Sequence, residues 1–157
     1  MKKIITLIVL IMTLNSCAEK IVINREVDST EYGKMLLGTQ SFDQFHKEPY
    51  KVWFDENYKI YPTDKPSIEA LKKAKINSYS ITVFLGTWCG DSKRNFPRLM
   101  KILDETKFPK SKLHIIGVNR KKQSPNGEEA KYNIVKVPTI ILEKYGKEIG
   151  RITEEPE

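Results

Sequence analysis

The sequence predicts an α/β fold, a central mixed sheet flanked by helices, over residues 67–152. Apolar β-branched and aromatic runs alternate there with stretches of helical periodicity, which is the order typical of parallel strands joined by crossover helices. The last two apolar runs are separated by a turn at Gly146, as in an antiparallel hairpin. With 157 residues, the chain is long enough for one domain that buries its own core.

Each element of this prediction rests on a local pattern. Strands are expected where short runs are rich in valine, isoleucine and aromatic residues, namely residues 79–85, 113–118, 137–142 and 147–152. Helices are expected at residues 68–74, 90–106 and 128–132. The middle helix carries apolar residues at helical spacing and contains Pro97, which is expected to kink it.

Three motifs in this region resemble those of the thioredoxin-like family. They are Trp88-Cys89-Gly90 at a strand-to-helix turn, Pro97 at the family's spacing for a helix-kinking proline, and Val137-Pro138-Thr139 as the loop whose proline is cis. The resemblance implies a thioredoxin-like fold in which this loop faces Cys89, the attacking cysteine. It assigns the attacking role to Cys89 and places Trp88, Gly90, Asp91, Val137, Pro138 and Thr139 around it. Ser92, which departs from the family's pattern, is the second catalytic candidate.

Cys89 is expected to react because it lies just before a helix. Unpaired backbone N–H groups and the helix dipole stabilise a thiolate at that position. Asp91, which replaces the proline common in the family's motif, opposes the thiolate, whereas Lys93 and Arg94 favour it. Val83 occupies the position where many thioredoxins keep a buried acid for proton transfer.

Ser92 stands where the family has a second, resolving cysteine. Serine can donate a hydrogen bond to the thiolate or simply be a polar residue compatible with a helix start, but it cannot form a disulfide. We therefore expect monothiol–disulfide exchange through Cys89 on protein or low-molecular-weight thiols, with an external thiol that resolves each adduct. Two alternatives stay open: a non-catalytic module that binds an extended peptide beside Trp88, and a structural protein with no thiol role.

Residues 31–66 lie outside the resemblance and form an aromatic-rich N-terminal extension. Its aromatic side chains include Phe42, Phe45, Tyr50, Trp53, Phe54, Tyr58 and Tyr61. Their spacing predicts two short helices separated by Pro49, followed by an extended stretch from Tyr58 to Pro62. We expect the rings either to pack as extra core, in place of the family's terminal helix, or to form a client-binding surface near Cys89.

The N-terminal sequence indicates export and membrane attachment. Residues 1–16 combine two lysines with an apolar run, as in a signal peptide, and the run is shorter than the roughly 20 residues of a membrane-spanning helix. Residues 14–17 resemble the lipobox of bacterial lipoproteins, which implies lipidation of Cys17 and a location in the cell envelope. The expected plan continues with a lipid-anchored tether at 17–30, the extension at 31–66, the thioredoxin-like domain at 67–152 and a tail at 153–157.

Charge and cysteine content argue against several other classes. The 27 basic and 20 acidic residues give a net charge of +7, but the lysines are scattered, so no nucleic-acid partner is expected. His46 and His114 have no cysteine near them, so neither a metal nor another cofactor is predicted. With lipid on Cys17, Cys89 is the one remaining thiol and no internal disulfide forms.

Overall fold

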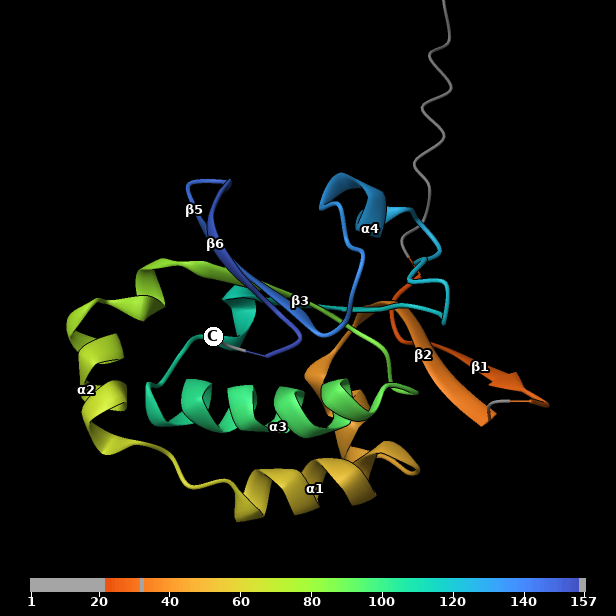
Figure 1. Ribbon diagram of the computed structural model, residues 1–157, viewed down its shortest axis with the longest axis horizontal. Coiled ribbons are helices and arrows are strands. Elements are labelled where there is room, and N and C mark those ends of the chain that lie inside the picture. The colour runs from red at the N-terminus through yellow and green to blue at the C-terminus, as the bar shows by residue number, and fades with distance from the viewer. Residues whose placement is uncertain (1–21, 32, 156–157) are drawn as a thin grey trace, which may run out of the picture.

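The computed structural model describes residues 22–31 and 33–155, which form a mixed sheet with helices on both faces (Figure 1). The six strands lie in the order β1-β2-β4-β3-β5-β6; β3 and β4 are parallel and every other neighbouring pair is antiparallel. The strands are β1 (Arg25–Ser29), β2 (Gly33–Gln40), β3 (Ser80–Leu85), β4 (Leu113–Gly117), β5 (Thr139–Lys144) and β6 (Lys147–Thr153). The predicted fold class is confirmed.

Helices and short turns of helix connect these strands. The α-helices are α1 (Tyr50–Ile60), α2 (Lys65–Lys73), α3 (Gly90–Glu105) and α4 (Glu128–Lys131). Short 3-10 helices lie at Phe42–His46, Ile76–Ser78 and Lys110–Lys112. Every strand and helix predicted after residue 66 is present within a few residues of its expected ends, and α3 runs through Pro97 without interruption.

The strands β1 and β2 form a hairpin that the sequence analysis did not predict. They occupy part of the expected tether, 17–30, and of the aromatic extension, 31–66. β2 buries Leu36 and pairs with β4, whereas β1 consists of polar and charged residues around Val27 and joins the sheet through its backbone. A strand that is held by backbone hydrogen bonds does not need alternating apolar residues, so nothing in the sequence of β1 predicted a strand. Residues 25–29 of the stretch expected as a tether therefore belong to the sheet.

The expectations for membrane attachment fall largely on a part of the chain that the structure does not describe. The predicted signal peptide, residues 1–16, and the lipidation site Cys17 lie outside the described residues. Within residues 22–31 and 33–155, no helix combines the length and the apolar character needed to cross a bilayer.

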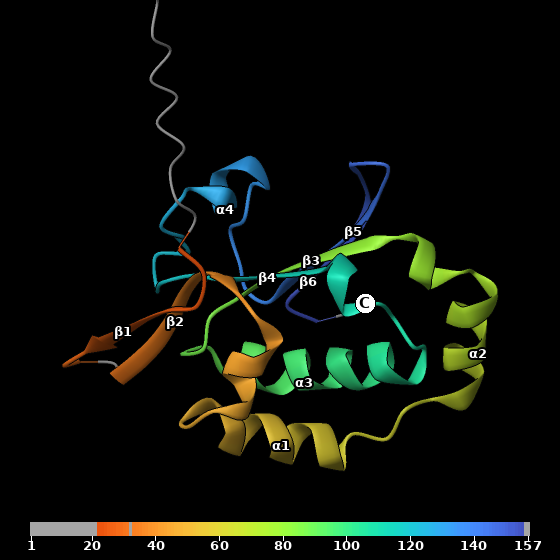
Figure 2. The same cartoon turned by 180° about the vertical axis from the view of Figure 1, so that it is seen from behind.

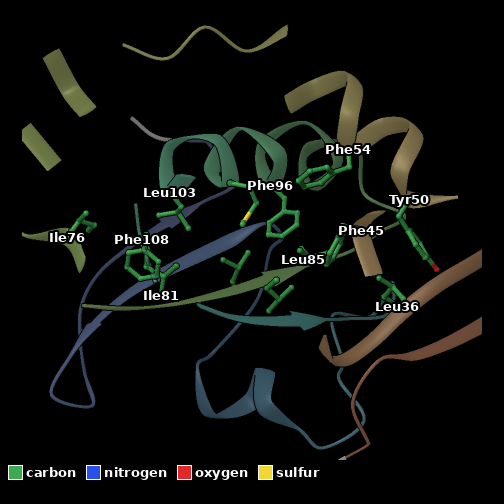
Figure 3. Packing of buried hydrophobic residues seen from close by; sticks show 13 residues of the cluster. Leu36, Phe45, Tyr50, Phe54, Ile76, Ile81, Leu85, Phe96, Leu103 and Phe108 are labelled. Atoms are coloured by element: carbon green, nitrogen blue, oxygen red, sulfur yellow. The ribbon is translucent and has the colours of Figure 1, made fainter. Parts of the chain in front are cut away.

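The aromatic extension covers the side of α3 that faces away from the sheet (Figures 1 and 2). Phe45 is fully buried, and its ring centroid lies 4.6 Å from that of Phe96 on α3 (Figure 3). The interpretation of these rings as extra core holds for Phe45, Tyr50 and Phe54, which are buried, whereas Trp53 is partly exposed. Helix α1 continues to Ile60, so the extended stretch expected from Tyr58 begins only at Tyr61.

The sheet separates two clusters of buried side chains. The larger lies between the sheet and the layer formed by α3 and α1, and β3 contributes Val83 to it. Because successive residues of a strand point to opposite faces, Phe84 belongs to the smaller cluster on the other side. Trp88 and Cys89 pack against this smaller cluster. The predicted reactive cysteine thus lies at the boundary between the smaller core and the start of α3.

Candidate active site at Cys89

Cys89 is the residue that precedes α3 at the end of the turn after β3. Its N–H donates to the Gly86 carbonyl at 2.9 Å, and its carbonyl accepts a hydrogen bond from the Lys93 N–H at 3.0 Å. The side chain of a residue in this position lies near the free N–H groups of the first helical turn, which stabilise an anionic sulfur. The side chain is partly exposed, so a reagent has access to it.

The loop before β5 faces Cys89, as the resemblance implies. The Sγ atom lies 3.3 Å from the Val137 carbonyl oxygen, and the thiol can donate its proton to that oxygen. The Val137–Pro138 peptide is cis, which confirms the predicted geometry. Thr139 is buried and its hydroxyl donates to the Lys136 carbonyl at 2.7 Å, so its polar group is used inside the loop.

Ser92 is fully buried one helical turn after Cys89. Its hydroxyl oxygen accepts a hydrogen bond from the Gly86 N–H at 3.2 Å. This bond ties the first turn of α3 to the end of β3. Of the two roles that the sequence leaves open, it supports the structural one, and a catalytic role for Ser92 stays a prediction.

Charged groups at the start of α3 largely balance one another. The Arg94 guanidinium lies 3.0 Å from an Asp91 carboxylate oxygen and also pairs with Glu155. The Asp91 charge, which the sequence analysis expected to oppose a thiolate, is therefore partly neutralised. Gly90 is exposed, with open space where a side chain would stand. Among the described residues, no three histidine, cysteine, aspartate or glutamate side chains gather to hold a metal ion.

Trp88 is held in place by residues that the sequence analysis missed. Its indole N–H donates to the Val118 carbonyl at 2.9 Å, and the Arg120 guanidinium lies 5.2 Å from the ring centroid. The ring passes so close to Gly86 that a Cβ there would lie 2.5 Å from an indole carbon. The one sequence feature that could have indicated this packing is Gly86, a glycine directly after a buried strand. Val118 and Arg120 follow a different strand, so the sequence does not place them beside Trp88.

Replacing Gly86 with alanine is expected to displace Trp88. The added methyl group overlaps the indole, so the Gly86→Ala chain should lose the indole hydrogen bond to Val118 and about 1–3 kcal/mol of unfolding free energy. Urea unfolding and the indole N–H signal in nuclear magnetic resonance spectra measure both effects. Gly150→Ala is the matched control, because nothing lies within 4 Å of a Cβ at that position. Equal stability of the two variants would contradict this packing.

A cysteine at a helix start after a central strand, opposite a cis-proline loop, defines a thioredoxin-like protein. The thioredoxin family model matches residues 68–157, and the chain belongs to the thioredoxin family. No curated protein matches the sequence. At this turn the sequence reads Cys89-Gly-Asp-Ser92, with serine where the resemblance implies a second cysteine.

Two solved structures with TM-scores above 0.5 agree on the fold. A protein of unknown function from Pseudomonas aeruginosa is similar, with a TM-score of 0.56 and 15% identity over 76% of this chain and 74% of its own. An HIV epitope-scaffold is similar, with a TM-score of 0.55 and 16% identity over 75% of this chain and 73% of its own. Mitochondrial thioredoxin 3 from Saccharomyces cerevisiae, in its oxidised form, matches with a TM-score of 0.38 and 24% identity over 64% of this chain and 90% of its own. At these identities, the first two likenesses show the fold alone.

Proposed function

We propose that this protein carries out thiol–disulfide exchange with a single thiol, Cys89, on protein or low-molecular-weight thiols and disulfides. The observation that carries the proposal is the position of the Cys89 sulfur, at the start of α3 and 3.3 Å from the Val137 carbonyl oxygen. The buried Ser92 keeps the local fold but supplies no resolving thiol. Membership of the thioredoxin family supports a redox or binding role.

In the proposed reaction, the Cys89 thiolate attacks one sulfur of a disulfide. A bond forms between Cys89 and that sulfur, the original S–S bond breaks, and the other sulfur leaves as a thiolate. An external thiolate then attacks the mixed disulfide and releases Cys89. The two steps exchange one thiol–disulfide pair for another, so no further oxidant or reductant is consumed.

We also propose that the protein acts in the cell envelope, held to a membrane by a lipid on Cys17. The apolar run and the lipobox-like residues 14–17 support this location. β1 begins at Arg25, and a chain from Cys17 to Arg25 spans at most about 30 Å when fully extended. Such a short connection would keep the folded domain, and Cys89 with it, near the membrane surface.

The alkylation rate of Cys89 by iodoacetamide tests the proposed reaction. The chain is used at full length with Cys17→Ser, so that Cys89 is its only thiol. At neutral pH we expect the native chain to react at least about tenfold faster than the urea-unfolded chain, because the helix start stabilises the attacking anion. The Cys89→Ala chain is the control for labelling elsewhere. A native rate at or below the unfolded rate would contradict exchange and favour the module that binds an extended peptide without chemistry.

A further inference from the structure

A cavity of about 320 Å³ opens beside the turn that carries Cys89. Its walls come from segments far apart in the sequence: the start of β2, the start of α1, the start of α3 and the loop after β4. Figure 1 shows that α1 and α3 both begin on the side of the molecule that carries the β1–β2 hairpin. The volume lies at the lower end of the range for small-molecule sites, which is about 300–1,000 Å³.

The charged side chains that line this cavity are all basic. Lys34, Lys93 and Arg120 line it, and no carboxylate does so among the described lining residues. Lys34 is balanced by Glu26, whose carboxylate lies 2.9 Å from the ammonium group. Lys93 forms no ion pair with any residue that the structure describes. The interior is therefore positive, and an anionic group entering it would gain favourable electrostatic interactions.

Aromatic rings complete the cavity. Trp53 and Trp88 are both partly exposed there, and the Arg120 guanidinium stacks on the Trp88 ring at 5.2 Å from its centroid. The Tyr50 hydroxyl is already used, since it donates to Glu26 at 3.0 Å. Rings that bind the apolar body of a ligand, next to cations that bind a carboxylate, are the usual composition of a site for a small organic anion.

The cavity adjoins the turn that carries Cys89, although Cys89 itself is not one of its lining residues. Thr87 and Trp88, the residues just before the cysteine, line it, and so does Lys93, whose N–H bonds the Cys89 carbonyl. Asp91 is not among its lining residues and is paired with Arg94. The nearest acidic group at the helix start therefore adds little repulsion.

We propose that this cavity holds the anionic part of the substrate, so that Cys89 exchanges preferentially with small carboxylate-bearing thiols and disulfides. This inference rests on the proposed exchange reaction and names its substrate class. Lys93 and Arg120 act as specificity-determining residues that attract the carboxylate, while Trp53 and Trp88 contact the body of the molecule. The exchange chemistry itself is unchanged: the Cys89 thiolate forms a bond to one sulfur of the bound disulfide, and the other half leaves as a thiolate.

Two aromatic disulfides that differ in charge test the proposal. Dithiobis(nitrobenzoate) is an anion, and dithiodipyridine is neutral. Attack by Cys89 releases the yellow nitrothiobenzoate anion from the first reagent and the neutral thiopyridone, which absorbs in the ultraviolet, from the second. Stopped-flow absorbance therefore gives both second-order rates. The chain is again full length with Cys17→Ser, in a neutral detergent, and the urea-unfolded chain supplies the reference ratio. We expect the native chain to favour the anion, with Lys93→Gln and Arg120→Gln each lowering the anion-to-neutral ratio about two- to fivefold.

Lys59→Gln is the matched control, because it removes one positive charge from the opposite end of α1. Raising the ionic strength from about 0.01 M to 1 M should abolish the preference of the native chain while leaving the rate with the neutral disulfide unchanged. A ratio equal to that of the unfolded chain, or unaffected by both cavity substitutions, would overturn the substrate class and leave the exchange reaction standing. Slow reaction with both reagents, no faster than in the unfolded chain, would overturn the exchange reaction and this inference with it.

Discussion

Exchanging Ser92 for cysteine should turn the proposed single-thiol exchange at Cys89 into dithiol catalysis, with a gain of at least about tenfold in insulin reduction by dithiothreitol. Residue 92 lies one helical turn after Cys89, where it is fully buried and accepts a hydrogen bond from the Gly86 N–H. A thiol at this position stands in place of the hydroxyl, within the same turn as Cys89. The second thiol can then expel a bound substrate from Cys89 as the intramolecular disulfide forms. Loss of the Ser92 hydrogen bond to Gly86 is expected to cost about 1 kcal/mol of stability.

The turbidity of precipitating insulin measures this gain, and a thiol titration follows the new disulfide. In the background of Cys17→Ser, the oxidised Ser92→Cys chain should contain no free thiol. The double variant Cys89→Ala with Ser92→Cys is the control, since it has one thiol but lacks the attacking cysteine. Two free thiols after mild oxidation, or a rate no higher than that of the parent chain, would contradict the expected geometry.

Replacing Phe45 with alanine should lower the free energy of unfolding by about 3–5 kcal/mol. Phe45 has no exposed surface, and its ring contacts those of Tyr50, Trp53, Phe54 and Phe96. Truncation therefore leaves a cavity where the aromatic extension meets α3. Because several rings meet at this one side chain, their mutual packing is lost together with the buried area.

Urea unfolding followed by circular dichroism measures the loss at Phe45. Val52→Ala is the control: it removes apolar atoms from α1 at a side chain that is 63% exposed, and it should change stability by less than about 0.5 kcal/mol. Similar small losses in both variants would mean that the extension contributes little to the fold of the thioredoxin-like domain.

The sequence predicted the central part of the fold because its elements carry strong patterns. β3 is buried on both faces and reads as a continuous apolar run, and α3 repeats apolar residues at helical spacing. The hairpin of β1 and β2 was missed for the opposite reason. β1 lies at the sheet edge with a charged sequence. β2 begins at Gly33, in a segment that was interpreted as helical because of the aromatic residues that follow it.

The candidate site also has a part that the sequence predicted and a part that it did not. Cys89 and Pro138 belong to local motifs, so their juxtaposition could be predicted from the family resemblance. The contacts of Trp88 could not, because they depend on where the loop after β4 lies. The position of Lys34 beside this loop likewise depends on the pairing of β2 with β4, and that strand was absent from the prediction.

The two outermost strands have a further consequence for how copies of this chain meet. β1 and β6 each pair with a strand on one side only, and such a sheet edge is a template for a strand from another molecule. Their sequences are REVDS and KEIGRIT, and β6 pairs with β5 through a register shift at Leu142/Glu143. Charged side chains and an irregular register both hinder the addition of a foreign strand. At high concentration, copies of this chain should therefore remain separate rather than pair edge to edge into one continuous sheet.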